Sequence, residues 1–69
     1  MDEINGKLGQ KIRELRESQN LTQEKLGDMI GVSQDYLSRI EQGKKNPTVN
    51  RLYKIAGGLG VQVCDLIEF

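Results

Sequence analysis

The chain has 69 residues, with ten basic and ten acidic side chains, a formal net charge of zero, one cysteine and no histidine. This length predicts a single domain over residues 1–69 with a small core. Apolar residues form no run of about 18, which excludes a membrane span. The N-terminus has no basic-then-apolar signal segment, so we expect a cytoplasmic protein. A lone cysteine excludes an internal disulfide, and without histidine no zinc cluster can be assembled. We expect no metal site and no cofactor, and no small-molecule ligand is evident.

Apolar spacing and capping residues predict five helices. Leu8, Ile12 and Leu15 recur at helical intervals and indicate an amphipathic helix over residues 4–18. Residues 63–67 are expected to form a short last helix. The three helices between them each have a hydroxyl N-cap and a glycine stop, which are Thr22 and Gly31, Ser33 and Gly43, and Thr48 and Gly60. The sequence therefore predicts an all-α fold with short connections.

Residues 22–42 have the pattern of a helix-turn-helix. Gly27 permits two helices to pack closely, Gly31 allows the chain to reverse, and apolar residues anchor the second helix of the pair, namely Val32, Leu37 and Ile40. The other face of that helix is polar and carries Gln34, Asp35, Ser38 and Arg39. In this motif such a face lies in the major groove of DNA.

Basic residues are concentrated in two segments although the net charge is zero. Residues 7–16 hold four basic side chains against one acidic one, and residues 39–54 hold five against one. These segments either form one basic face for nucleic acid or are solvated helix faces.

Gly57 and Gly58 lie inside the fourth predicted helix and indicate either tight packing there or a loose helix.

Residues 10–67 resemble the Cro/phage-repressor type of helix-turn-helix domain, often called XRE-like. The matching stretches are residues 12–16, 21–26, 31–33, 40–44, 46–48 and 59–61. The resemblance implies the compact five-helix repressor fold and sequence-specific binding to double-stranded DNA. It further implies transcription regulation, by default repression, by a homodimer on a palindromic operator.

The resemblance also implies which side chains read bases. Gln34 is the expected reader of adenine, and Arg39 is expected to make a bidentate contact with guanine. Ser38 lies on the same face. Asp35 is either an acceptor for a cytosine amino group or only an acidic residue of the first turn.

Other polar residues are expected to contact phosphates. Gln23 begins a helix whose free N–H groups suit a phosphate, and in similar repressors this glutamine also braces the one that matches Gln34. Tyr36 either offers its hydroxyl to a phosphate or is a half-buried packing residue. The remaining expected phosphate contacts are Ser33, Gln42, Lys44, Lys45 and Asn46.

Two further expectations concern stability and assembly. The resemblance implies a bidentate ion pair between Arg16 and Glu41, the alternative being two unrelated surface charges. Cys64 is expected to be a small buried hydrophobe. Apolar residues near the C-terminus either form a self-complementary dimer patch or complete the monomer core, and these are Val61, Val63, Leu66, Ile67 and Phe69.

Enzymatic activity is not expected, because the sequence offers no histidine base, no activated cysteine and no phosphate-binding loop. The alternative function is an antitoxin or adaptor that uses the same fold to bind a protein. Such proteins often carry an extension that neutralises the partner, and this sequence shows none.

Overall fold

Three hydroxyl side chains begin helices in this chain. In the computed structural model, which describes residues 3–68, the side-chain oxygens of Thr22, Ser33 and Thr48 each accept a hydrogen bond from a backbone N–H three residues later. Gly31 and Gly60 end two of these helices at φ values of 76° and 71°, a left-handed conformation that glycine adopts without strain. Capping residues therefore set most helix boundaries.

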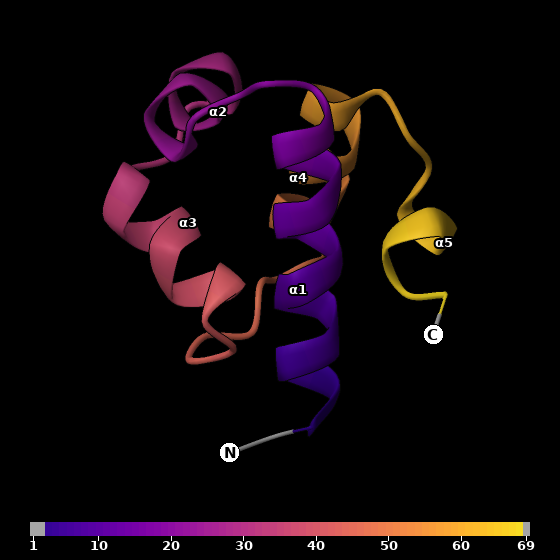
Figure 1. Ribbon diagram of the computed structural model, residues 1–69. Coiled ribbons are helices and arrows are strands. Elements are labelled where there is room, and N and C mark those ends of the chain that lie inside the picture. The colour runs from indigo at the N-terminus through magenta and orange to yellow at the C-terminus, as the bar shows by residue number, and fades with distance from the viewer. Residues whose placement is uncertain (1–2, 69) are drawn as a thin grey trace.

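The regular structure of residues 3–68 consists of five helices and includes no strand. They are α1 (Glu3–Ser18), α2 (Gln23–Ile30), α3 (Gln34–Glu41), α4 (Val49–Leu59) and α5 (Val63–Leu66). Figure 1 shows α2 and α3 on one side of α1 and α5 on the other. The expected all-α, five-helix fold is confirmed.

Differences from the sequence-based boundaries are confined to helix ends. The first helix begins one residue earlier than predicted, and the last is one residue shorter. The third ends at Glu41, two residues before Gly43, because Gln42 is its C-cap. No helix within residues 3–68 combines the length and apolar character that crossing a bilayer requires.

One apolar face of each helix contributes to the core. The buried apolar side chains are Leu8, Ile12, Leu26, Leu37, Ile40, Ile55, Ala56, Leu59 and Leu66. Removing a leucine or isoleucine side chain from water stabilises the fold by roughly 1.5–3 kcal/mol. Because Leu37 and Ile40 are both fully buried, they fix the rotation of α3 and leave its opposite face outward.

Glycines allow two pairs of segments to approach closely around α3. A Cβ on Gly27 of α2 would lie 2.6 Å from the carbonyl oxygen of Val32, in the turn before α3. A Cβ on Gly9 of α1 would overlap the carbonyl oxygen of Ile40. Side chains at these positions would push α3 away from its two supporting helices.

The adjacent glycines of α4 have different surroundings. A Cβ on Gly58 would lie 2.6 Å from Cγ2 of Ile30 on α2, whereas a Cβ on Gly57 would meet no heavy atom within 4 Å. Tight packing therefore applies to Gly58 alone, and α4 continues unbroken through both residues.

In the C-terminal region the structure favours the core alternative for Leu66, and the expectation of a buried Cys64 is wrong. Leu66 is fully buried in the monomer core and therefore cannot belong to an exposed dimer patch. Cys64 is exposed, and its Sγ lies 3.6 Å from Oε1 of Gln62. The reason is that α5 packs through Val63 and Leu66, which are one helical turn apart. Phe69, also expected in the patch, lies outside the described residues.

Candidate nucleic-acid interface

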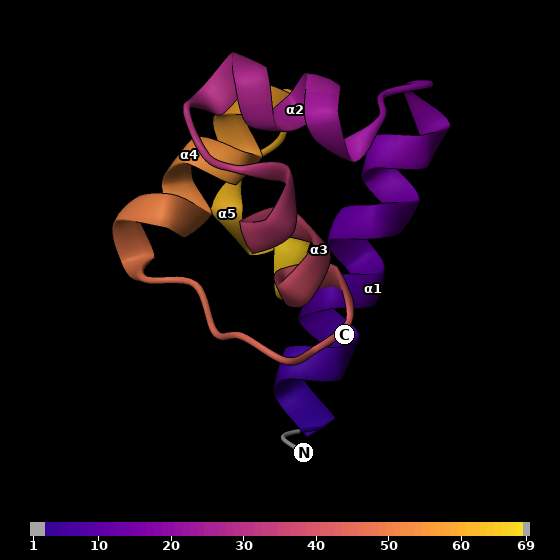
Figure 2. The ribbon, with the colours of Figure 1, turned by 90° about the vertical axis from the view of Figure 1, so that its left-hand side faces the viewer.

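The outward face of α3 is polar. Gln34, Asp35 and Arg39 are exposed and Ser38 is half-buried. Figure 2, viewed from the side of α2 and α3, shows α3 with the loop to α4 beside it. A helix presented in this way has the dimensions to enter the major groove, where every base pair has a distinct pattern of donors and acceptors.

Hydrogen bonds along α3 orient part of this face. Nε of Arg39 donates to Oδ2 of Asp35 at 3.0 Å, which leaves the two terminal nitrogens of the guanidinium outside that bond. Nε2 of Gln42 donates to Oγ of Ser38 at 2.8 Å. The Gln34 amide makes no side-chain hydrogen bond within residues 3–68, so both its donor and its acceptor are available to a ligand.

A buried ion pair joins the end of α3 to α1. Arg16 donates to both carboxylate oxygens of Glu41, from Nε at 2.7 Å and from Nη2 at 3.0 Å. Its Nη1 donates to the carbonyl oxygen of Leu21 at 2.6 Å. The hydrogen bond to Glu41 raises the pKa of the Arg16 guanidinium despite the opposing effect of burial. One arginine thus fixes α1, the loop before α2 and the C-terminus of α3.

Gln23, the first residue of α2, joins the same buried network. Its Nε2 donates to Oε1 of Glu41 at 3.0 Å. The amide is therefore held by the end of α3, and Gln23 makes no hydrogen bond with Gln34, contrary to the bracing expected from similar repressors. The start of α2 and the recognition helix are coupled through Glu41 instead.

The other residues expected to contact phosphate surround α3. Ser33, Gln42, Lys44, Lys45 and Asn46 are all exposed. Tyr36 is half-buried and packs against the core. Its ring lies under two cations, with Nζ of Lys45 at 5.7 Å and Cζ of Arg51 at 5.0 Å from the centroid. Arg51 was not among the predicted site residues, although it belongs to the basic segment 39–54.

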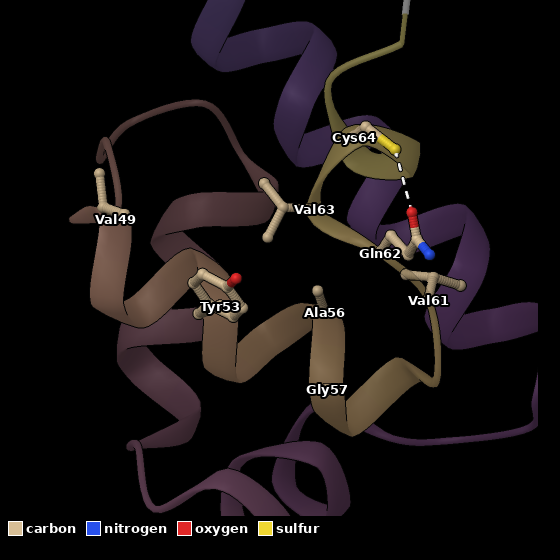
Figure 3. Close-up of a pocket in the computed structure, with 8 residues that line it drawn as sticks. All are labelled: Val49, Tyr53, Ala56, Gly57, Val61, Gln62, Val63 and Cys64. Carbon is tan, nitrogen blue, oxygen red and sulfur yellow. Dashed lines mark hydrogen bonds between the residues drawn. The ribbon is translucent and has the colours of Figure 1, made fainter.

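A second surface lies between α4 and α5. A hollow of about 570 Å³ is lined by Val49, Tyr53, Ala56, Gly57, Val61, Gln62, Val63 and Cys64. Figure 3 shows Tyr53, Ala56 and Val63 around it. Val49 and Tyr53 are 75% and 70% exposed, while Ile67 at the chain's end is 51% exposed. The patch predicted from the sequence did not include Val49 and Tyr53. The spacing of four between these two apolar residues was the only sequence signal that could have indicated them.

No group of three or more histidine, cysteine, aspartate or glutamate residues within 3–68 is placed to hold a metal ion. The site consists instead of a polar helix face, a rigid buried support and nearby cations.

Comparison with known proteins assigns the fold to a family, because residues 12–66 match the helix-turn-helix family model. The chain belongs to the Cro/phage-repressor type of helix-turn-helix regulators. It is 43% identical over 60 residues to an uncharacterized HTH-type transcriptional regulator of Sinorhizobium fredii, covering 87% of this chain and 78% of that protein. It is 42% identical over 62 residues to the control protein C.BamHI of Bacillus amyloliquefaciens, covering 88% and 76%.

A solved structure has the same architecture. The restriction-modification controller protein C.AhdI from Aeromonas hydrophila superimposes with a TM-score of 0.88 at 32% identity, covering 90% of this chain and 94% of that one. The matched proteins are described as a transcriptional regulator, a control protein and a restriction-modification controller protein. This helix-turn-helix protein is accordingly a transcriptional regulator with a DNA-binding fold.

Proposed function

We propose that this helix-turn-helix protein is a repressor that binds a palindromic operator in double-stranded DNA as a homodimer. The observation that carries this proposal is the outward polar face of α3, whose rotation and position are fixed by the buried bonds among Arg16, Gln23 and Glu41. A rigid helix loses little conformational freedom on entering the groove, so more of its contact energy serves discrimination between sequences.

Base reading is assigned to Gln34 and Arg39. The Gln34 carboxamide can donate to N7 and accept from the N6 amino group of adenine, and the terminal nitrogens of Arg39 match O6 and N7 of guanine. Each such bidentate pair contributes roughly 1–3 kcal/mol of discrimination. Ser38 lies beside them, and Asp35 is assigned to the orientation of Arg39 because it already binds Nε of that side chain.

Phosphate contacts are assigned to the residues around the ends of α2 and α3. Gln23 lies at the N-terminus of α2, where free backbone N–H groups and the positive end of the helix dipole favour an anion. The remaining assigned contacts are Ser33, Gln42, Lys44, Lys45 and Asn46. Such contacts set the register on DNA and make the affinity depend on salt.

The homodimer is assigned to the α4–α5 face, defined here as Val49, Tyr53, Val61 and Val63. Exposed apolar area of this kind on a small domain favours association, and a two-fold dimer buries the same face of each copy. Two recognition helices about 34 Å apart would read successive major grooves on one side of DNA, which requires a palindrome. Repression follows most simply, because an occupied operator excludes polymerase from an overlapping promoter.

Selection of bound sites from a random duplex pool tests the proposal. We expect an enriched palindrome that binds at least about 1,000-fold more tightly than a random duplex, the lower end of the roughly 10³–10⁷-fold range of specific regulators. Alanine at both Gln34 and Arg39 should abolish that preference while random-duplex binding persists. If no sequence is enriched and binding to random DNA is negligible at low salt, the antitoxin or adaptor function is favoured instead.

A further inference from the structure

Two cations from other segments of the chain lie over the ring of Tyr36. Lys45 comes from the loop after α3, and Arg51 comes from the first turn of α4. Both charges lie within the roughly 6 Å over which a cation is attracted to an aromatic face. Tyr36 belongs to α3, the helix that carries the base-reading face, so the cations are held beside that helix.

These cations have no acidic partner in the described part of the chain. Within residues 3–68, neither Lys45 nor Arg51 forms a salt bridge, whereas Arg39 is paired with Asp35 at 3.0 Å. Two like charges at one ring repel each other, and an anion beside them relieves that repulsion. The arrangement therefore favours a bound anion.

The position of Arg51 in its helix supports the same conclusion. It lies three residues after the N-cap Thr48, near the positive end of the α4 dipole, and the first turn of α4 holds no acidic residue. A cation at a helix N-terminus is destabilising, because the dipole favours negative charge there. The Tyr36 ring offsets part of this cost, and a phosphate would offset it directly.

We propose that Arg51 contacts a backbone phosphate of DNA beside the recognition helix, and that the Tyr36 ring, rather than its hydroxyl, positions Arg51 and Lys45 for that phosphate. This inference rests on the proposed DNA-binding function. It makes Arg51 an additional DNA-contacting residue and Tyr36 a positioning residue.

Titrations of the selected operator and of a random duplex at three salt concentrations test this assignment. Arg51→Met should weaken binding to both duplexes about three- to tenfold, and should make the negative slope of log K against log salt shallower by about 0.9 per bound copy. Lys54→Met, which removes an exposed charge one turn further along α4, is the matched control and should change the slope much less.

Two substitutions of Tyr36 separate ring from hydroxyl. Tyr36→Phe keeps the ring and should bind within twofold of the original protein, whereas Tyr36→Leu should weaken binding as Arg51→Met does. In the Tyr36→Leu background, Arg51→Met should add little further loss. Thermal denaturation checks folding, and if the leucine variant is unfolded, the phenylalanine variant and Arg51→Met still decide the question.

Two results would overturn the assignment. Equal effects of Arg51→Met and Lys54→Met would show that Arg51 makes no specific phosphate contact. A loss in Tyr36→Phe as large as in Arg51→Met would assign the contact to the hydroxyl. Both results require that the unaltered protein binds DNA; failure of that protein to bind any duplex would instead reject the proposed function.

Discussion

Glu41 is a buried carboxylate whose charge is fully compensated by neighbouring donors. Its side chain is 2% exposed, and its two oxygens accept hydrogen bonds from Nε and Nη2 of Arg16 and from Nε2 of Gln23. A buried charge is tolerated only with such partners, because removal from water is otherwise too costly. The directional demands of these bonds fix where the end of α3 lies relative to α1 and α2.

Replacing Glu41 by alanine should therefore affect stability more than base preference. The change leaves the Arg16 charge buried without its partner, and loss of one member of such a pair costs about 3–5 kcal/mol. Glu41→Gln keeps an acceptor and should lose less. Urea denaturation measures the unfolding free energy, and site selection measures base preference. An unchanged unfolding free energy with an altered preferred sequence would contradict this role for Glu41.

The bond between Asp35 and Arg39 predicts a different kind of effect. Asp35→Asn removes a negative charge from the proposed DNA-binding face, so affinity for random duplex should rise a few-fold. It also loosens Arg39, so discrimination at the guanine that Arg39 reads should fall, within the roughly 1–3 kcal/mol that one bidentate contact contributes. Binding to duplexes that vary at single positions measures both quantities. Arg39→Lys is the comparison, because it removes the bidentate geometry but keeps the charge.

At the scale of single helices, the sequence predicts structure well where the deciding contacts are local. Thr22, Ser33 and Thr48 were identifiable as caps because each bonds to a backbone N–H only three residues away. In α5, by contrast, a single turn has too few residues to display a period, so the sequence could not tell buried Leu66 from exposed Cys64.

Contacts between distant segments were predictable only in part. The Arg16–Glu41 pair followed from the family resemblance rather than from spacing, because 25 residues separate the two positions. The contact of Arg51 with the Tyr36 ring had no local signal at all, since it depends on how α4 packs beside α3. The sequence likewise did not indicate that Tyr53 is exposed, because α4 carries apolar residues on more than one face.

Two glycines provide a matched test of helix packing. Gly57→Ala adds a methyl group in open space within α4 and should stabilise the protein by about 0.5–1 kcal/mol through helix propensity. Gly27→Ala adds the same group against the Val32 carbonyl oxygen and should destabilise it by about 1–3 kcal/mol through overpacking. Chemical denaturation measures both changes in the unfolding free energy. It is done at low protein concentration, because Gly57 lines the α4–α5 hollow and the proposed dimer must not contribute to the result. Equal effects of the two substitutions would contradict the packing difference.

At the scale of the whole molecule, the two basic segments differ in how their charges are neutralised. In residues 7–16, salt bridges involve Lys7, Arg13 and Arg16, with Glu3, Glu17 and Glu41 as the partners. Among the basic residues of 39–54, only Arg39 forms a salt bridge within the described residues, and its partner is Asp35. The cations of that segment follow α3 directly, so the free positive charge of a neutral protein is concentrated beside the proposed recognition helix.

The proposed homodimer would place two recognition helices, with the cations beside them, on the two halves of a palindromic operator. Substitutions on the α4–α5 face test this dimer. Tyr53→Glu places a charge where the face is 70% exposed in the monomer, so folding should be little affected while association is disfavoured by the burial of an unpaired carboxylate. Sedimentation equilibrium should show a monomer, and affinity for the palindrome should fall at least tenfold, towards that for a single half-site.

Ile67→Glu distinguishes this face from the C-terminal patch, because Ile67 is exposed but does not line the hollow. This variant should remain dimeric and should keep the preference for the palindrome over a half-site. Dissociation by Ile67→Glu together with an intact dimer in Tyr53→Glu would move the interface to the end of the chain. A palindrome preference that survives in a strictly monomeric Tyr53→Glu protein would show that two copies assemble only on DNA, through contacts other than this face.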